Sequence, residues 1–155
     1  MEELVKLLIE KEKTISFMES CTGGFLANAI TNIPDSSKVI KFSAVTYSNE
    51  YKIKMGVPSD IIDKYTVYSE EVALSMAKTI SDYTNSNYGV GVTGKLKKVD
   101  EANPYGEDDM VYLAIYDRDN NISYCEEIKL TKDNRISCKE EIMKYFIVKI
   151  TEIIK

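Results

Sequence analysis

The sequence contains no histidine and no tryptophan, and only three cysteines and three prolines in 155 residues. Without histidine, a serine or cysteine nucleophile needs a base other than imidazole, so the lysines and tyrosines become the candidate bases. The cysteines, Cys21, Cys125 and Cys138, form no C-x-x-C pair, and a zinc site would need an unusual set of ligands. We therefore expect reduced thiols, no metal and no cofactor.

Excess positive charge and long apolar runs are also absent. The net charge of −5 supplies no positive field for DNA or RNA, so direct binding of nucleic acid is not expected. The acidic N-terminus lacks a secretory apolar region, and no apolar run approaches the length of a membrane span. These features predict a cytoplasmic protein without membrane contact. The sequence also has no P-loop, no dinucleotide-binding fingerprint and no G-x-S-x-G elbow.

Strand-like and helix-like patterns alternate through the first two thirds of the chain, and two strand-like runs around Asp-Arg-Asp-Asn then predict a hairpin. We expect strands at 14–18, 39–46, 88–93, 110–116 and 122–130. We expect helices from the N-terminus to about 13, from 25 to Pro34, at 48–55, from 58 or 59, from 69, and from 131 or 133. This order favours a single three-layer α/β/α domain over residues 1–155, with a mixed β-sheet.

The segment Ser20-Cys-Thr-Gly-Gly follows the first predicted strand and opens a helical pattern. Glycines at 23 and 24 let a ligand approach the backbone, and the N–H groups of Cys21 and Thr22 are placed to stabilise an oxyanion. Two interpretations of Ser20 stay open, a nucleophile or a helix N-cap. Cys21 is a second candidate nucleophile, because a helix N-terminus can lower the pKa of a thiol.

Two further segments also begin where predicted strands end. Tyr47 and Lys52 flank the start of a short helix, and Thr93-Gly94 closes the strand at 88–93. Since ligands collect at the carboxyl ends of strands in open α/β sheets, these segments are expected to converge with Ser20. A lysine shielded from water can act as a base, and a tyrosine can relay a proton. The alternative is that Tyr47 packs at the sheet end and Lys52 is a solvated lysine.

Several strings in this order resemble the CinA C-terminal domain family, over most of the chain. They are Glu19-Ser-Cys-Thr-Gly-Gly24, Tyr47-Ser-Asn-Glu50 with Lys52, Gly56-Val-Pro58, Val67-x-Ser-Glu-Glu-Val-Ala73 and Val92-Thr-Gly94. Members are similar to nicotinamide-nucleotide amidases, which convert nicotinamide mononucleotide and water to nicotinate mononucleotide and ammonia. The resemblance implies a homo-oligomer that acts on a small-molecule nucleotide. The additional N-terminal pyrophosphatase-type domain of the long family version is not expected here.

The resemblance also implies roles for individual residues. The family's nucleophilic serine falls on Ser20, and its helper tyrosine and lysine fall on Tyr47 and Lys52. Substrate-binding contacts are expected from residues of the same strings, namely Cys21, Thr22, Gly23, Gly24, Asn49, Thr93 and Gly94. Arg135 resembles a basic residue at the start of the family's last helix, with Lys139 one turn later, although a role on the helix surface is equally open.

One segment departs from the family pattern. A glycine-rich stretch usually follows the threonine-glycine pair, whereas residues 95–109 here mix lysines with acids and contain Asn103-Pro-Tyr-Gly106. A long loop in a compact domain is typical of a binding loop or a mobile one. The departure leaves two alternatives to an amidase: a non-catalytic nucleotide-binding regulatory protein, and a competence- or damage-related protein that acts through protein contacts.

Overall fold

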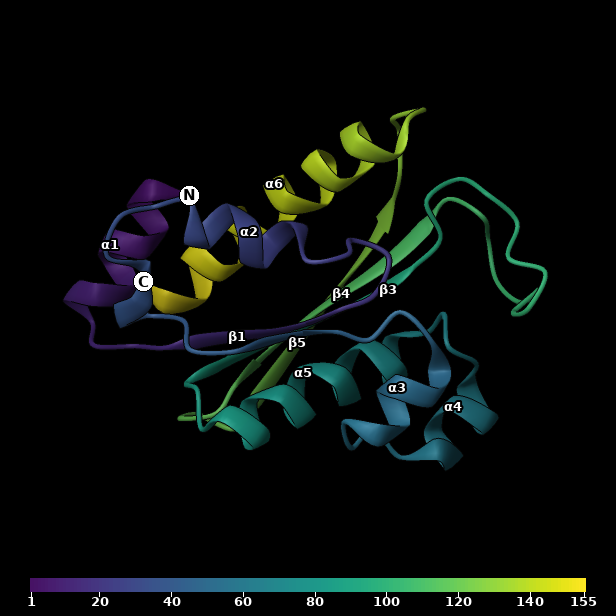
Figure 1. Cartoon of the computed structure of the whole chain (residues 1–155), viewed down its shortest axis with the longest axis horizontal. Coiled ribbons are helices and arrows are strands. Elements are labelled where there is room, and N and C mark those ends of the chain that lie inside the picture. Colours follow the sequence, from purple (N-terminus) through teal and green to yellow (C-terminus); the bar gives the residue numbers. More distant parts are fainter.

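The computed structural model describes residues 1–155 and contains one five-stranded sheet between two layers of helices (Figure 1). The strands are β1 (Ile15–Glu19), β2 (Ser43–Val45), β3 (Tyr88–Gly94), β4 (Met110–Asp117) and β5 (Ile122–Lys129). The helices are α1 (Glu2–Glu10), α2 (Phe25–Thr31), α3 (Asn49–Lys54), α4 (Ser59–Tyr65), α5 (Glu70–Thr84) and α6 (Arg135–Ile154), with a 3-10 turn η1 at Ser36–Lys38. The predicted three-layer α/β/α fold with a mixed sheet is confirmed.

The strands follow the order β2-β1-β3-β4-β5 across the sheet. β1 pairs in parallel with both β2 and β3, whereas β3 with β4 and β4 with β5 are antiparallel. The hairpin predicted around Asp-Arg-Asp-Asn is therefore β4–β5. Because β1, β2 and β3 run in the same direction, their carboxyl ends meet at one edge of the sheet.

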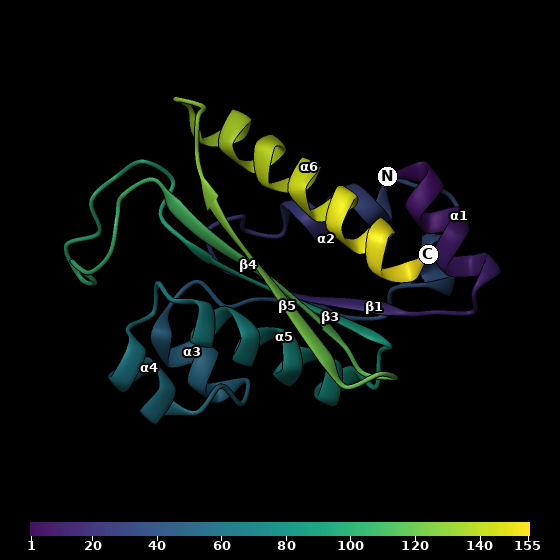
Figure 2. The same cartoon turned by 180° about the vertical axis from the view of Figure 1, so that it is seen from behind.

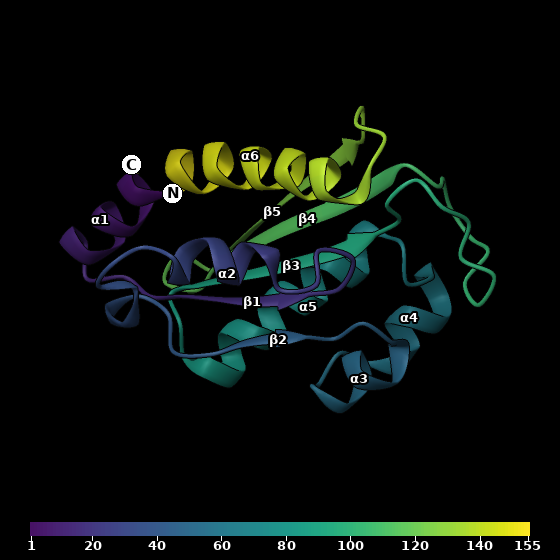
Figure 3. The ribbon, with the colours of Figure 1, turned by 45° about the horizontal axis from the view of Figure 1, so that its top comes forward.

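The helices divide between the two faces of the sheet. α1, α2 and α6 cover one face, and α3, α4 and α5 cover the other, as the two opposite views and the tilted view show (Figures 1, 2 and 3). The larger core lies under the first group, where Phe17 of β1 meets Phe146 of α6 edge to face at 5.4 Å between ring centroids. Burial of these apolar side chains is the main favourable contribution to folding.

Two glycines of β3 let α5 pack directly on the strand backbone. A Cβ atom at Gly89 would lie 2.0 Å from the carbonyl oxygen of Ala77, and one at Gly91 would lie 2.2 Å from that of Ala73. Either contact is far inside van der Waals distance, so only glycine fits at these positions. These glycines therefore serve the close packing of α5 on β3.

Element boundaries differ from the predictions where the chain leaves the sheet. The strand expected at 39–46 is only Ser43–Val45, and the 3-10 turn η1 precedes it. Val39 contacts β1 through one backbone hydrogen bond, which its carbonyl accepts from the Ile15 N–H. α6 begins at Arg135 because the Asn134 side chain accepts from the Ser137 N–H and caps the helix there. None of the helices combines the length and the apolar character required for crossing a bilayer.

Candidate active site

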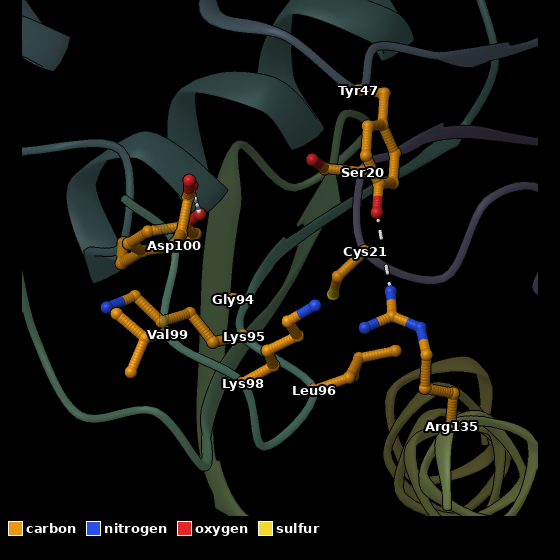
Figure 4. Close-up of a pocket in the computed structure, with 11 residues that line it drawn as sticks. Ser20, Cys21, Tyr47, Gly94, Lys95, Leu96, Lys98, Val99, Asp100 and Arg135 are labelled. Carbon is orange, nitrogen blue, oxygen red and sulfur yellow. Dashed lines mark hydrogen bonds between the residues drawn. The ribbon is translucent and has the colours of Figure 1, made fainter. Parts of the chain in front are cut away.

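Ser20 lies directly after β1, at the edge where the parallel strands end. Its backbone N–H donates to the Val92 carbonyl of β3 (3.0 Å), and its own carbonyl accepts from the Gly23 N–H (3.0 Å). Gly23 and Gly24 have φ angles of 63° and 89°, in the left-handed region that favours glycine. This tight turn presents the Ser20 side chain, which is 8% exposed, to a cavity of about 290 Å³ (Figure 4).

Glu19 fixes that turn from behind. Its carboxylate, buried at the end of β1, accepts hydrogen bonds from the backbone N–H groups of Gly24 (3.1 Å), Leu26 (3.2 Å) and Ala27 (2.9 Å). The N-terminus of α2 is therefore occupied by the protein's own anion. Gly24 holds the cap position of α2, so the interpretation of Ser20 as a helix N-cap is wrong.

Lys52 reaches Ser20 from α3, on the other side of the sheet edge. The Ser48 hydroxyl caps α3 by accepting from the Tyr51 N–H, and Lys52 follows one turn after the cap. The Lys52 Nζ lies 3.1 Å from the Ser20 Oγ and 2.8 Å from the carbonyl oxygen of Thr46. The structure thus joins two residues that are 32 positions apart in the sequence.

The environment of Lys52 disfavours its charged form. The side chain is 1% exposed, and no carboxylate lies within ion-pair distance of its amine. Burial lowers the pKa of Lys52 from 10.5 to about 8, against a smaller opposing effect of Cys21 and Asp100. About a tenth of the amine is therefore neutral at pH 7, beside the Ser20 hydroxyl. The alternative of a solvated Lys52 is wrong.

Cys21 also lines the cavity, but its thiol is poorly suited to attack. The side chain is 6% exposed, and burial raises the pKa of the Cys21 thiol to about 12. Since the thiolate is the nucleophilic form, the hydroxyl of Ser20 is the better candidate. The backbone N–H groups of Cys21 and Thr22 donate to no acceptor within the protein; Cys21 lines the cavity, whereas Thr22 is fully buried beside it.

Tyr47 stands at the mouth of the cavity, not between Ser20 and Lys52. Its side chain is 65% exposed, and its hydroxyl accepts from the Arg135 guanidinium (3.3 Å), as the dashed line in Figure 4 shows. Tyr47 forms no hydrogen bond with Ser20 or Lys52. Arg135, at the start of α6, lines the same cavity.

Of the other residues predicted to bind substrate, some line the cavity and the rest lie beside it. Gly94 lines the cavity, whereas the Thr93 hydroxyl is buried and donates to the Val67 carbonyl (2.9 Å). The Thr22 hydroxyl is buried without a partner. The Asn49 side chain donates to Asn103 (3.0 Å) and so ties α3 to the loop at 95–109. Gly23 and Gly24 shape the Ser20 turn without lining the cavity.

The loop at 95–109 forms one wall of the cavity. Lys95, which is 4% exposed, pairs with Asp108 at 3.0 Å. Asp100 accepts a hydrogen bond from the Tyr68 hydroxyl, and Lys97 pairs with Asp133 at 3.2 Å. The sequence did not predict that Glu19 holds the Ser20 turn, or that Tyr68 and Asp100 join in the cavity wall. An acidic residue inside a buried strand, immediately before the Ser20 turn, was the available signal for Glu19.

The family model described as the CinA C-terminal domain matches residues 1–154. A competence-damage inducible protein of Clostridium kluyveri is 44% identical over 120 residues, which make up 76% of this chain and 29% of that protein. A CinA-like protein of Dictyoglomus thermophilum is 38% identical over 137 residues, or 87% of this chain and 33% of that protein. The chain thus spans about a third of the length of the curated relatives that it matches.

Solved structures are similar over nearly the whole chain. The competence/damage inducible protein CihA from Agrobacterium tumefaciens superposes with a TM-score of 0.86 at 27% identity, covering 99% of this chain and 95% of that one. A CinA superfamily protein from Escherichia coli has a TM-score of 0.86 at 21% identity, covering 98% and 87% of the two chains, and this likeness concerns the fold alone. With the family model matched over almost every residue, the chain belongs to the CinA C-terminal domain family.

Proposed function

We propose that this protein is an amidohydrolase in which Ser20 attacks a carboxamide and Lys52 is the general base. The substrate class is a nicotinamide mononucleotide-like carboxamide, which yields the carboxylate and ammonia. The observation that supports this most is the 3.1 Å distance between the Ser20 Oγ and the Lys52 Nζ, inside the protein and beside a cavity. A nucleophile within hydrogen-bond reach of a base with a lowered pKa is the arrangement that acyl transfer requires.

Lys52 can move the proton without an intermediary. A neutral amine has two N–H groups and one lone pair; one N–H donates to the Thr46 carbonyl, and the lone pair is free to accept the Ser20 proton. The new bond joins the Ser20 Oγ to the amide carbon, and the protonated Lys52 then gives its proton to the departing nitrogen as the C–N bond breaks. A water molecule, deprotonated by Lys52 in turn, releases the carboxylate and restores the Ser20 hydroxyl.

Backbone N–H groups are candidate hydrogen-bond donors to the negative charge that develops on the carboxamide oxygen. The N–H groups of Cys21, which lines the cavity, and of Thr22 beside it have no acceptor within the protein and belong to the turn that carries the nucleophile, and Glu19 holds that turn in place. Preorganised backbone donors of this kind stabilise tetrahedral intermediates. In this proposal Tyr47 contacts the substrate at the cavity mouth, since it is not needed to pass a proton between Ser20 and Lys52.

The substrate phosphate fits the basic side of the cavity. Arg135 and Lys98 line it without an acidic partner, and the Lys139 amine lies 3.5 Å from where a Cβ of Gly23 would be. The N-terminus of α2 is not a candidate for the phosphate, because Glu19 already accepts from its N–H groups. The phosphate is therefore assigned to side-chain cations at the start of α6 and in the 95–109 loop.

Ammonia release tests this function. The wild-type protein is expected to release ammonia from nicotinamide mononucleotide and much less from free nicotinamide, which lacks the phosphate. Ser20→Ala should remove turnover while circular dichroism and the unfolding midpoint stay near wild-type values. Lys52→Ala should lower kcat by about 10²–10⁴-fold. Full turnover by Ser20→Ala would exclude the nucleophile assignment.

The 95–109 loop supports a second candidate, a nucleotide-binding protein without turnover. Its contacts to α3 and to Tyr68 build a cavity wall from residues that depart from the family pattern. The same assay separates the two candidates. Binding of nicotinamide mononucleotide by calorimetry, together with no ammonia release across the pH range, would favour the binding protein.

A further inference from the structure

Asp100 is the only carboxylate among the residues that line the Ser20 cavity. Its oxygens accept hydrogen bonds from the Tyr68 hydroxyl, the Asn103 side-chain amide (3.0 Å) and the Ala102 backbone N–H (3.1 Å). These three donors are neutral, and no lysine or arginine lies within ion-pair distance of Asp100. The hydrogen bonds from Tyr68 and Asn103 hold the pKa of Asp100 below its usual range. The cavity therefore contains an anion whose charge is not balanced.

Unbalanced positive charge lies across the cavity from Asp100. Lys95 is neutralised by Asp108, but Lys98 and Arg135 have no acidic partner. Figure 4 shows Asp100 and Arg135 on opposite sides, with the Lys98 amine extending toward the Arg135 side. A cavity with one free anion and two free cations on opposite walls is complementary to a ligand that carries both charges.

Asp100 and the nucleophile line the same cavity, so both face the space that a substrate would occupy. The charge of Asp100 is among those that raise the pKa of Lys52, whose amine contacts Ser20. A substrate whose carboxamide carbon contacts the Ser20 Oγ would have the group that carries the carboxamide inside the cavity that Asp100 also lines. The aromatic rings of Tyr47 and Tyr68 line the same space; the Lys95 amine lies over the Tyr68 ring at 5.1 Å, whereas the Tyr47 ring is 65% exposed and offers an apolar surface to a flat ring.

We propose that Asp100 makes this cavity selective for substrates whose carboxamide is attached to a positively charged ring. The anionic end of the same molecule lies at the opposite wall, against Lys98 and Arg135. This inference rests on the proposed function, because the pyridinium ring of nicotinamide mononucleotide belongs to this class. It assigns the specificity for ring charge to a residue of the 95–109 loop, the segment in which this chain departs from its family.

Two other roles for Asp100 make different predictions. If its carboxylate accepted the N–H groups of the carboxamide, it would favour charged and uncharged rings equally. If it only held the loop through Ala102 and Tyr68, its replacement would weaken every ligand to a similar extent. Sensitivity to the charge of the ring, with all other groups of the ligand unchanged, therefore separates these roles.

The test uses two ligands that differ in ring charge, nicotinamide mononucleotide and its reduced form, whose dihydropyridine ring is neutral. Their affinities are measured by calorimetry in the Ser20→Ala protein, which prevents turnover. We expect the charged ring to bind about three- to tenfold more tightly, as for a partly exposed ion pair. Adding Asp100→Asn, which keeps an acceptor oxygen for Ala102, should abolish this preference mainly by weakening the charged ligand.

Glu101→Gln is the matched control. It removes one negative charge from the same loop at an exposed position outside the cavity lining, so the preference should persist. Equal losses for both ligands in Asp100→Asn, no preference in the parent protein, or no binding of either ligand would each overturn the inference. The comparison needs no turnover, so a failure of the proposed amidase activity is read separately, from ammonia release by the wild-type protein.

Discussion

The rate of amide hydrolysis is expected to rise with pH and to level off above the pKa of Lys52. Burial lowers this pKa from 10.5 to about 8, and the base must be neutral to accept the Ser20 proton. About 1% of the amine is then neutral at pH 6 and about a tenth at pH 7. The value of kcat/KM should therefore increase about tenfold per pH unit until the midpoint near pH 8.

Steady-state ammonia release at constant ionic strength, from about pH 5.5 to about pH 9.5, measures this profile. Lys52→Arg is the control, because a guanidinium stays protonated in proteins and cannot serve as the base. Its residual rate should show no rise with a midpoint near pH 8. A wild-type profile that is flat, or one that still rises about tenfold per pH unit at the upper end of the measured range, would refute the assignment of a buried lysine base.

The same pKa shift has a consequence for stability. Between about pH 8 and 10.5 the unfolded chain keeps the Lys52 proton while the folded protein has released it, so the free energy of unfolding rises with pH across this window. The rise amounts to about 3 kcal/mol for a shift of this size. Urea unfolding at both ends of the window should show this increase in the wild-type protein and not in Lys52→Met, since methionine does not titrate.

Three further substitutions test the framework of the site. Glu19→Gln is expected to lower the free energy of unfolding by about 1–3 kcal/mol and to reduce kcat, because three N–H groups at the start of α2 lose a carboxylate acceptor. An unchanged midpoint in thermal denaturation would contradict this. Tyr47→Phe should change the free energy of unfolding by less than about 0.5 kcal/mol, since the ring is 65% exposed. It should also lower kcat/KM by less than about tenfold, and a loss as large as that of Lys52→Ala would show that the hydroxyl transfers the proton. Gly91→Ala should destabilise the protein by about 2 kcal/mol or more in urea unfolding, because the new Cβ would meet the Ala73 carbonyl 2.2 Å away; wild-type stability would disprove the close packing of α5 on β3.

Much of the architecture follows from local patterns in the sequence. The spacing of apolar residues and the cap at Ser69 predicted α5, and the Asp-Arg-Asp-Asn turn between two β-prone runs predicted the β4–β5 hairpin. These features depend on neighbouring residues, so the sequence carries their signal directly. Predictions failed where a boundary depended on distant packing, as in the predicted strand at 39–46, of which only Ser43–Val45 pairs with β1.

The lack of histidine and the Ser20-Cys-Thr-Gly-Gly turn made a serine with a lysine or tyrosine base one of the open interpretations, and the resemblance to the CinA C-terminal domain family assigned these roles to Ser20 and Lys52. Sequence alone did not establish that Lys52 is buried, because a lysine pattern on a short helix is the same whether it faces water or the sheet. The tertiary structure decided this by bringing α3 under the ends of β1 and β2, where desolvation changes the chemistry of the amine.

The charges around the cavity depended on the fold in the same way. In the sequence, Glu19, Asp100 and Arg135 are three among many charged residues, and nothing local distinguishes them. In the folded chain, Glu19 is buried against α2, while Asp100 and Arg135 face one cavity, and neither has a partner of opposite charge within ion-pair distance. Sequence thus determined which reactive groups and secondary elements exist. Which of those groups are desolvated, paired or left free was decided by the tertiary structure, since electrostatic interactions depend on distances in space and on exclusion of water.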